Sequence, residues 1–193
     1  MRLFVAADVG DDTRAQVRSV REQLEPLLRG RRAPRVAWVR EQAAHVTLRF
    51  IGEIADEHAV LVESALTPTL ALAPFEVGWD RLGSFPRGRS PRVIWIGATR
   101  GRDALSALAT MVAARLEAIV GPGEARPFNP HLTIARVRDP GRVAWPDLLT
   151  HVSLEPIVAR IDHVTLYRSR LSPKGATYTE VCRAALTTSE KLT

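Results

Sequence analysis

The sequence predicts an α+β fold in which a duplicated, bilobal unit forms a single two-lobed domain over residues 1–193. Strand-like and helix-like patterns alternate along the chain in the order β-α-β-β-α-β-β-α-β-α-β-β. Two helix-bearing halves each contain a strand that starts with the motif His-x-Thr, and no proline- or serine-rich linker separates them. With 46% hydrophobic residues, a chain of 193 residues can bury a good core, so we expect the halves to be lobes of one body.

The first half begins with an apolar run and then changes between strand and helix patterns. Three strands are predicted, over residues 2–8, 36–40 and 45–51. Apolar residues at helical spacing predict one helix from Asp11 to before Gly30 and a second over residues 56–66. The basic stretch at residues 29–35 predicts a solvated turn, and an edge that faces RNA is the sharper alternative.

The second half repeats the change between strands and helices. Five strands are predicted, over residues 75–82, 92–98, 131–136, 161–167 and 177–185. Apolar residues from Leu105 to Ile119 predict a long helix that ends at Gly121, and residues 145–150 predict a short one. The Gly/Pro/Arg segment at residues 83–91 predicts a loop between the first two strands.

The charge of the chain favours an anionic partner. The net charge is +6, and only Lys174 and Lys191 among the 27 basic residues are lysines. The planar guanidinium of arginine suits bidentate contacts to phosphate. The alternative explanation is a codon bias toward arginine, which charge alone does not separate from a function.

The remaining bulk features predict a cytoplasmic protein. Charged residues interrupt every apolar stretch, so we expect no membrane span, and the sequence from Met1 lacks the apolar core and cleavage site of a signal peptide. The single cysteine, Cys182, cannot form an internal disulfide, which fits a reducing compartment. Its alternating strand context predicts a packed thiol rather than a nucleophile.

Three segments match the pattern His-x-Thr followed by an aliphatic residue. They are His45-Val46-Thr47-Leu48, His131-Leu132-Thr133-Ile134 and His163-Val164-Thr165-Leu166. Positions i and i+2 of a strand face the same side, so each motif places an imidazole beside a hydroxyl. Imidazole, with an ordinary pKa near ~6.5, can give or take a proton at neutral pH, and the hydroxyl can donate to a phosphate oxygen.

A single His-x-Thr match favours a structural role, but two matches in two half-repeats favour catalysis. In-line displacement at phosphorus needs a base near the attacking oxygen and an acid near the leaving oxygen, on opposite sides. Two histidines from two lobes meet that need without a metal. The motifs are accompanied by no His-x-x-x-His, cysteine pair, acidic cluster or Walker loop, so we expect neither a metal nor another cofactor.

The surroundings of the first two motifs resemble one protein family. Residues 38–40 followed by His45-Val46-Thr47-Leu48-Arg49-Phe50-Ile51-Gly52 resemble the first motif of the two-histidine phosphoesterases, most closely the RNA 2′,3′-cyclic phosphodiesterases, formerly called 2′-5′ RNA ligases. Residues 126–136, Arg-Pro-Phe-Asn-Pro-His-Leu-Thr-Ile-Ala-Arg, resemble its second motif. Residues 2–6 and 166–178 also fit, so the resemblance spans nearly the whole chain. It departs at Ala44, where the family has a larger apolar residue, and at His163.

The resemblance implies a bilobal α+β fold with antiparallel sheets flanking a basic central cleft and helices on the outside. It also implies that a 2′,3′-cyclic phosphate is opened to a 2′-phosphomonoester. By motif position, His45 is the general acid, His131 is the base, and Thr47 and Thr133 hold the phosphate oxygens. The residues themselves support a pair of histidines but do not say which of the two is the acid.

Two arginines near the motifs are candidates for binding the substrate. Arg49 has the strand parity of His45 and Thr47, so simple alternation points it into the cleft. Arg136 is out of parity with Thr133 unless a bulge turns it inward. The family pattern favours Arg136 and alternation favours Arg49, and we predict both.

Aromatic residues and the other histidines complete the set of candidates. Phe128, Trp38 and Tyr167 are suited to stack on a base, with core packing the stronger expectation for Trp38. His163 is taken as a chance match, because the family has no catalytic histidine on its C-terminal strand. His58 and His151 have no partner pattern and are expected at the surface.

We therefore expect a monomeric enzyme that acts on RNA with 2′,3′-cyclic phosphate ends. One alternative is reversible 2′-5′ RNA ligation, since the same acid–base pair run backward joins ends. Another is a non-catalytic RNA-end-binding protein. Intact His-x-Thr pairs in both halves argue against the latter, because binding needs no acid and base.

Overall fold

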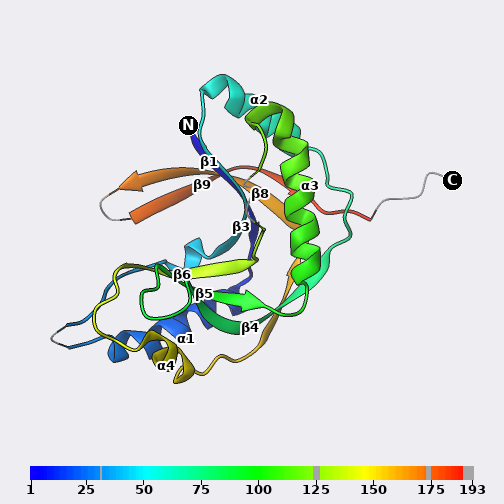
Figure 1. Ribbon diagram of the computed structural model, residues 1–193. Helices are drawn as coiled ribbons and strands as arrows, with labels where there is room; N and C mark the ends of the chain where they lie inside the picture. Colours follow the sequence, from blue (N-terminus) through cyan, green and yellow to red (C-terminus); the bar gives the residue numbers. More distant parts are fainter. Residues whose placement is uncertain (31, 124–126, 173–174, 189–193) are drawn as a thin grey trace.

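A computed structural model describes residues 1–30, 32–123, 127–172 and 175–188 (Figure 1). The first half contains β1 (Arg2–Asp8), α1 (Asp11–Leu27), β2 (Arg35–Trp38), a short 3-10 helix η1 (Glu41–Ala43), β3 (His45–Glu53) and α2 (Asp56–Leu66). The remainder contains β4 (Phe75–Phe85), β5 (Val93–Ala98), α3 (Arg102–Val120), β6 (His131–Asp139), α4 (Trp145–Thr150), β7 (Ile157–Ile161), β8 (His163–Ser172) and β9 (Gly175–Ala185). In the part of the chain that is described, no helix has the length and apolarity needed to cross a bilayer.

All strand pairs are antiparallel, and together they form one continuous sheet in two lobes. The strand order is β7-β4-β5-β6-β3-β1-β8-β9, and β2 adds to β6. The lobe β7-β4-β5-β6 meets the lobe β3-β1-β8-β9 where Val46 of β3 pairs with Leu132 of β6. The predicted α+β class with two antiparallel lobes is confirmed, and the two predicted sheets are halves of a single one.

The two lobes are related by an internal repeat. β1-α1-β3 in the first half corresponds to β5-α3-β6 in the second, since each ends in a His-x-Thr strand at the centre of the sheet. Each helix crosses to the other lobe: α1 packs near β7, and α3 packs near β3. Gln16 on α1 fixes one crossing by donating to the carbonyl of Trp79 (2.9 Å) and that of Glu155 (2.6 Å). The helices lie on the outside of the sheet, as predicted (Figure 1).

The largest differences from the predicted elements lie near the ends of the second lobe. β4 continues to Phe85, beyond the predicted end at residue 82, so the predicted loop at residues 83–91 begins only after Phe85. The segment stays extended because its residues 83–85 pair with residues 93–95 of β5, and the Phe85 and Trp95 rings pack with centroids 5.0 Å apart. β7 is an additional strand, whose residues alternate between half-buried and exposed before the buried Ile161. The predicted strand at 161–167 begins at His163 as β8 and continues to Ser172, because it pairs along its length with β9.

Candidate active site

A bulge in β3 decides which side chains this strand presents to the centre of the molecule. Neighbouring residues of β1 pair with Thr47 and Arg49, so Leu48 has no partner of its own. The extra residue shifts the alternation by one. His45, Thr47 and Phe50 therefore line one face of the strand, and Arg49 turns away from it.

Arg49 consequently does not follow the predicted alternation. Its side chain is 7% exposed, and Nη2 donates to the carbonyls of Gly121 (2.9 Å) and Pro122 (2.8 Å) just after α3. The guanidinium thereby satisfies the carbonyl of the residue that caps α3, Gly121, and the carbonyl of the residue that follows it. Arg49 borders a second hollow of about 760 Å³, to which Phe128, His131 and Arg136 also contribute.

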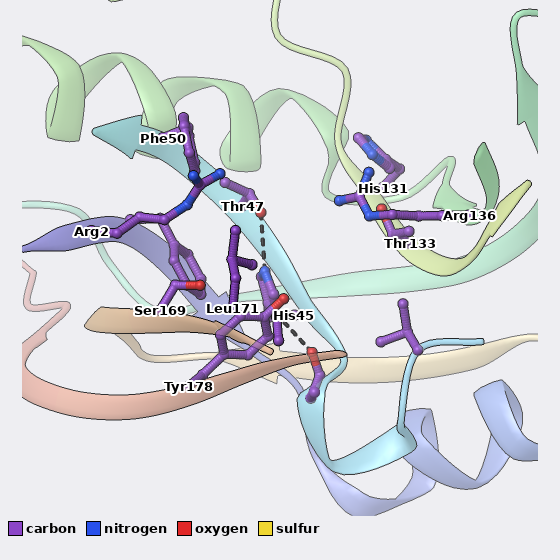
Figure 2. A pocket seen from close by; sticks show the side chains of 14 residues that line it. Arg2, His45, Thr47, Phe50, His131, Thr133, Arg136, Ser169, Leu171 and Tyr178 are labelled. Atoms are coloured by element: carbon purple, nitrogen blue, oxygen red, sulfur yellow. Dashed lines mark hydrogen bonds between the residues drawn. The ribbon is translucent and has the colours of Figure 1, made fainter. Parts of the chain in front are cut away.

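A matching bulge in β6 has the opposite consequence for its arginine. Neighbouring residues of β5 pair with Thr133 and Ala135, so Ile134 is the extra residue. The shift brings Arg136 onto the face of His131 and Thr133, where all three line the same hollow (Figure 2). Arg136, the arginine that the family pattern favours, thus reaches the site through a bulge in β6, as its sequence position required.

The central hollow has a volume of about 410 Å³ and is lined from both lobes. Figure 2 shows His45 and Thr47 on the β3 wall facing His131, Thr133 and Arg136 on the β6 wall. The arginines among the described lining residues are Arg2 and Arg136, and that lining contains no carboxylate. The arrangement suits a group with negative charge between two imidazoles.

The two catalytic candidates are anchored in the same way. Nδ1 of His45 lies 2.8 Å from the carbonyl oxygen of Ala43, and Nδ1 of His131 lies 2.7 Å from that of Asn129, in each case two residues upstream. A carbonyl only accepts hydrogen bonds, so each Nδ1 carries the proton. Nε2 is thereby left for the hollow, and in His45 it lies 3.0 Å from the hydroxyl oxygen of Thr47.

Aromatic rings pack against both imidazoles, and more of them surround His45 than His131. The His45 ring packs on Phe4 with centroids 4.8 Å apart, and Tyr178 meets it edge-on at 5.3 Å. The His131 ring meets Phe85 edge-on at 5.1 Å. Restricted rings keep Nε2 directed at the hollow, which general acid–base catalysis requires.

Burial sets the protonation of both histidines. Desolvation lowers the pKa of His45 and of His131, and the carbonyl bonded to each Nδ1 partly opposes it. The positive charge of Arg136 lowers the pKa of both imidazoles further. The charge of Asp8 raises the pKa of His45, so the two environments are not equivalent.

The other candidates fall outside the central hollow. Phe128 lines the second hollow, and Tyr167 lines a third next to His45. Trp38 packs against the core, which is the role expected for it. His58 and His151 are exposed, as predicted, and the thiol of Cys182 is partly buried against the core.

Sequence reasoning predicted none of Arg2, Phe50 and Tyr178 as lining residues of the central hollow. Phe50 follows from the bulge, which the sequence does not reveal, whereas Arg2 reaches the site because β1 pairs with β3. Within the described residues, no three His, Cys, Asp or Glu side chains are grouped so as to hold a metal ion.

Two His-x-Thr strands that face each other across a bilobal antiparallel sheet define the architecture of the two-histidine phosphoesterases. Residues 9–172 match the family described as the 2′-5′ RNA ligase superfamily, and the chain belongs to this family. The chain is similar to the RNA 2′,3′-cyclic phosphodiesterase of Archaeoglobus fulgidus, with 34% identity across 94% of this chain and 98% of that protein. It is also similar to the enzyme of the same name from Thermotoga maritima, with 32% identity across 92% and 91%.

Solved structures agree with the sequence relatives. TT0787 of Thermus thermophilus superimposes with a TM-score of 0.76 at 27% identity, covering 98% of this chain and 100% of that one. Escherichia coli LigT in complex with 3′-AMP superimposes with a TM-score of 0.72 at 27% identity, covering 96% and 98%. The likeness extends over both lobes and therefore includes the two strands that form the site.

Proposed function

We propose that this protein is an RNA 2′,3′-cyclic phosphodiesterase that opens the cyclic phosphate to a 2′-phosphomonoester without a metal. The observation that carries the proposal is the pair of anchored imidazoles, whose Nε2 atoms are left for one hollow from opposite walls. The relatives named RNA 2′,3′-cyclic phosphodiesterase support this class of reaction. LigT, whose complexes with 3′-AMP and with phosphate are known, offers nucleotide and phosphate binding in the same fold.

In the proposed mechanism, the cyclic phosphate sits between β3 and β6. Nε2 of His131 takes a proton from water as the water oxygen attacks phosphorus. The bond from phosphorus to the 3′ oxygen breaks in line, and Nε2–H of His45 protonates that oxygen. The product keeps the phosphate on the 2′ oxygen, and a proton exchange with solvent returns both histidines to their starting states.

The hydroxyls and the arginine have complementary roles in this proposal. Thr47 and Thr133 donate to the non-bridging phosphate oxygens, whose charge grows in the transition state. Arg136 neutralises the same charge from the β6 wall. Arg49 is proposed as a structural residue, since its guanidinium is bonded to the carbonyls after α3.

The proposed position of the leaving group also places the nucleoside. Because the 3′ oxygen departs toward His45, its ribose lies on the β3 side. The aromatic ring of Tyr178 borders both hollows that contain His45 and is suited to stack on the base. On the other side, His131 needs room only for water.

The test is hydrolysis of a cyclic-phosphate RNA oligomer and a 2′,3′-cyclic mononucleotide in excess EDTA, with the phosphate position of the product assigned by 31P NMR. We expect undiminished turnover and a 2′-phosphate. A 3′-phosphate product would contradict the proposed leaving group, and loss of activity that is restored by a divalent ion would contradict metal independence. RNA binding without turnover would favour a non-catalytic end-binding protein.

The family is itself named for 2′-5′ RNA ligation. In that reaction a 5′-hydroxyl would replace water as the nucleophile: His131 would take its proton, the 3′ oxygen would leave protonated by His45, and a 2′-5′ phosphodiester would form. Incubating the two RNA ends at high concentration measures this activity directly. A joined product that forms faster than hydrolysis would make ligation the principal function.

A further inference from the structure

The third His-x-Thr motif, which does not reach the central hollow, holds a half-buried carboxylate at the end of β1. Oδ2 of Asp8 accepts hydrogen bonds from the hydroxyl of Thr165 (2.6 Å) and from Nε2 of His163 (3.2 Å). Oδ1 accepts one from the hydroxyl of Tyr167 (2.6 Å). The three donors are at positions i, i+2 and i+4 of β8, so one face of this strand is directed at a single carboxylate.

Asp8 is also the cross-strand neighbour of His45. The two residues are paired in the register of β1 and β3, and both line a hollow of about 470 Å³. In the second half of the repeat, the residue paired with His131 is Gly97. A Cβ atom at Gly97 would come within 2.7 Å of the Trp95 ring, so this place cannot take a side chain as the structure stands. One histidine therefore has a carboxylate opposite it, and the other has a hydrogen atom.

We propose that Asp8, held by His163, Thr165 and Tyr167, is a positioning residue that makes His45 rather than His131 the proton donor. The inference rests on the proposed function and goes beyond it by naming the group that distinguishes two otherwise similar histidines. A nearby negative charge stabilises the imidazolium form, which is the form that a general acid must have before the reaction.

The charge of Asp8 persists across the working pH range. Burial raises its pKa, but the hydrogen bonds from His163, Thr165 and Tyr167 outweigh burial and lower the pKa to about 2. The carboxylate is therefore ionised at neutral pH. Its charge raises the pKa of His45 against the desolvation of that ring, whereas the pKa of His131 responds to burial, to its carbonyl partner and to Arg136.

Among the described residues that line the two hollows next to His45, no group other than Asp8 carries a negative charge. β6 contributes His131 and Arg136, and the remaining ionisable residues lining the hollows that His45 shares are Arg2, Arg14, Arg40, Tyr167 and Tyr178. Among the described residues that line these two hollows, Asp8 is the single carboxylate. Its loss would leave His45 facing only neutral and positive groups.

Substitution of His163 should shift the pKa of His45 in the direction opposite to that caused by loss of Asp8, which provides a second test. Its hydrogen bond to Asp8, more than burial, raises the pKa of His163, and Asp162 adds to this through Nδ1 at 2.6 Å. When protonated, His163 cancels part of the Asp8 charge felt by His45. His163→Gln keeps a donor for Asp8 but removes the positive charge.

The experiment is an NMR titration of the histidine rings in the substrate-free protein, for the wild type, Asp8→Asn and His163→Gln. We expect the midpoint of His45 to fall in Asp8→Asn and to rise in His163→Gln, while that of His131 stays in place. The alkaline limb of the pH–rate profile should move with His45, with about tenfold less activity on that side for each unit by which the midpoint falls.

General loosening of the site would move the midpoints of His45 and His131 in the same direction in both variants. It therefore cannot produce a fall of the His45 midpoint in Asp8→Asn together with a rise in His163→Gln. An unchanged His45 midpoint in folded Asp8→Asn, or equal shifts of His45 and His131, would overturn the inference. If Asp8→Asn does not fold, the absence of an upward shift in His163→Gln overturns it alone. A wild type without phosphodiesterase activity would refute the proposed function, and the titration would still decide the effect of Asp8.

Discussion

The β3 and β6 strands share a backbone plan but differ in what surrounds it. Each begins with a histidine whose Nδ1 is bonded to the carbonyl two residues upstream, continues with a threonine, and then bulges. After the bulge, Phe50 takes the place on β3 that Arg136 takes on β6. Across the strand, one histidine meets Asp8 and the other meets Gly97.

The repeat supplies one proton-transfer group on each wall, and the divergence of the two halves supplies the differences between their surroundings. In-line chemistry at phosphorus needs a proton-transfer group on each side, and a two-fold repeat provides that geometry from one motif. The two groups must then do opposite work, which identical surroundings cannot arrange. In the proposed mechanism, the carboxylate of Asp8 beside His45 and the guanidinium of Arg136 beside Thr133 are the differences that give each wall its role.

The comparison predicts its largest effect at the histidines themselves. His45→Ala and His131→Ala should each lower kcat by about 10²–10⁴-fold, because each removes one proton transfer. The double variant should be little worse than either single one, since the two residues act as a unit. Steady-state kinetics on a cyclic mononucleotide measure this, with exposed His58→Ala as the control. Full activity in either single variant would break the proposed pairing.

The threonines should come next. Thr47→Val and Thr133→Val should each lower kcat by about a hundredfold with a small change in KM, because the hydroxyls act on charge that develops in the transition state. Thr67→Val, at the end of α2, serves as the matched control. A raised KM with an unchanged kcat would indicate instead that the hydroxyls bind the ground state as strongly as the transition state.

The residues after the two bulges should differ in their effect on pH dependence. Arg136→Gln should cost about tenfold in kcat/KM, the value of one hydrogen bond to a charged group. It should also move both limbs of the pH–rate profile to higher pH, because the Arg136 charge lowers the pKa of both histidines and its removal raises both. Phe50→Leu carries no charge change and should leave both limbs in place. A profile that Arg136→Gln does not move would remove this arginine from the site.

Arg49 should affect stability and leave the chemistry intact. Arg49→Met removes two hydrogen bonds to the carbonyls after α3, which should cost about 2 kcal/mol of unfolding free energy and about 4–8 °C in Tm. Thermal unfolding and kcat measured on the same preparation test both parts. A large loss of kcat with an unchanged Tm would restore Arg49 to the substrate site that alternation predicted.

The sequence predicted the parts of the site that depend on local periodicity. His45 with Thr47, and His131 with Thr133, follow from strand alternation over two residues, which no distant contact needs to support. The positions of Arg49 and Arg136 depend on bulges, and a bulge is a property of two paired strands that one strand's sequence does not display.

The same distinction applies to the fold. The order of strands and helices in the first half followed from hydrophobic patterns, and the two-lobed antiparallel class was anticipated through the family resemblance. The continuation of β4 to Phe85 was missed because pairing with β5 and packing on Trp95, rather than the local pattern, keep that segment extended. The link from His163 to Asp8 joins residues 155 positions apart, so only the register of β1 and β8 places them together.

The most direct test of the division of labour between the two histidines uses a cyclic nucleotide in which sulfur replaces the 3′ bridging oxygen. A thiolate leaves without being protonated, so the reaction no longer needs an acid but still needs a base. We predict that His45→Ala regains activity to within about tenfold of the wild type on this substrate, whereas His131→Ala stays inactive. Rescue of His131→Ala instead of His45→Ala would contradict the account, because it would make His131 the proton donor.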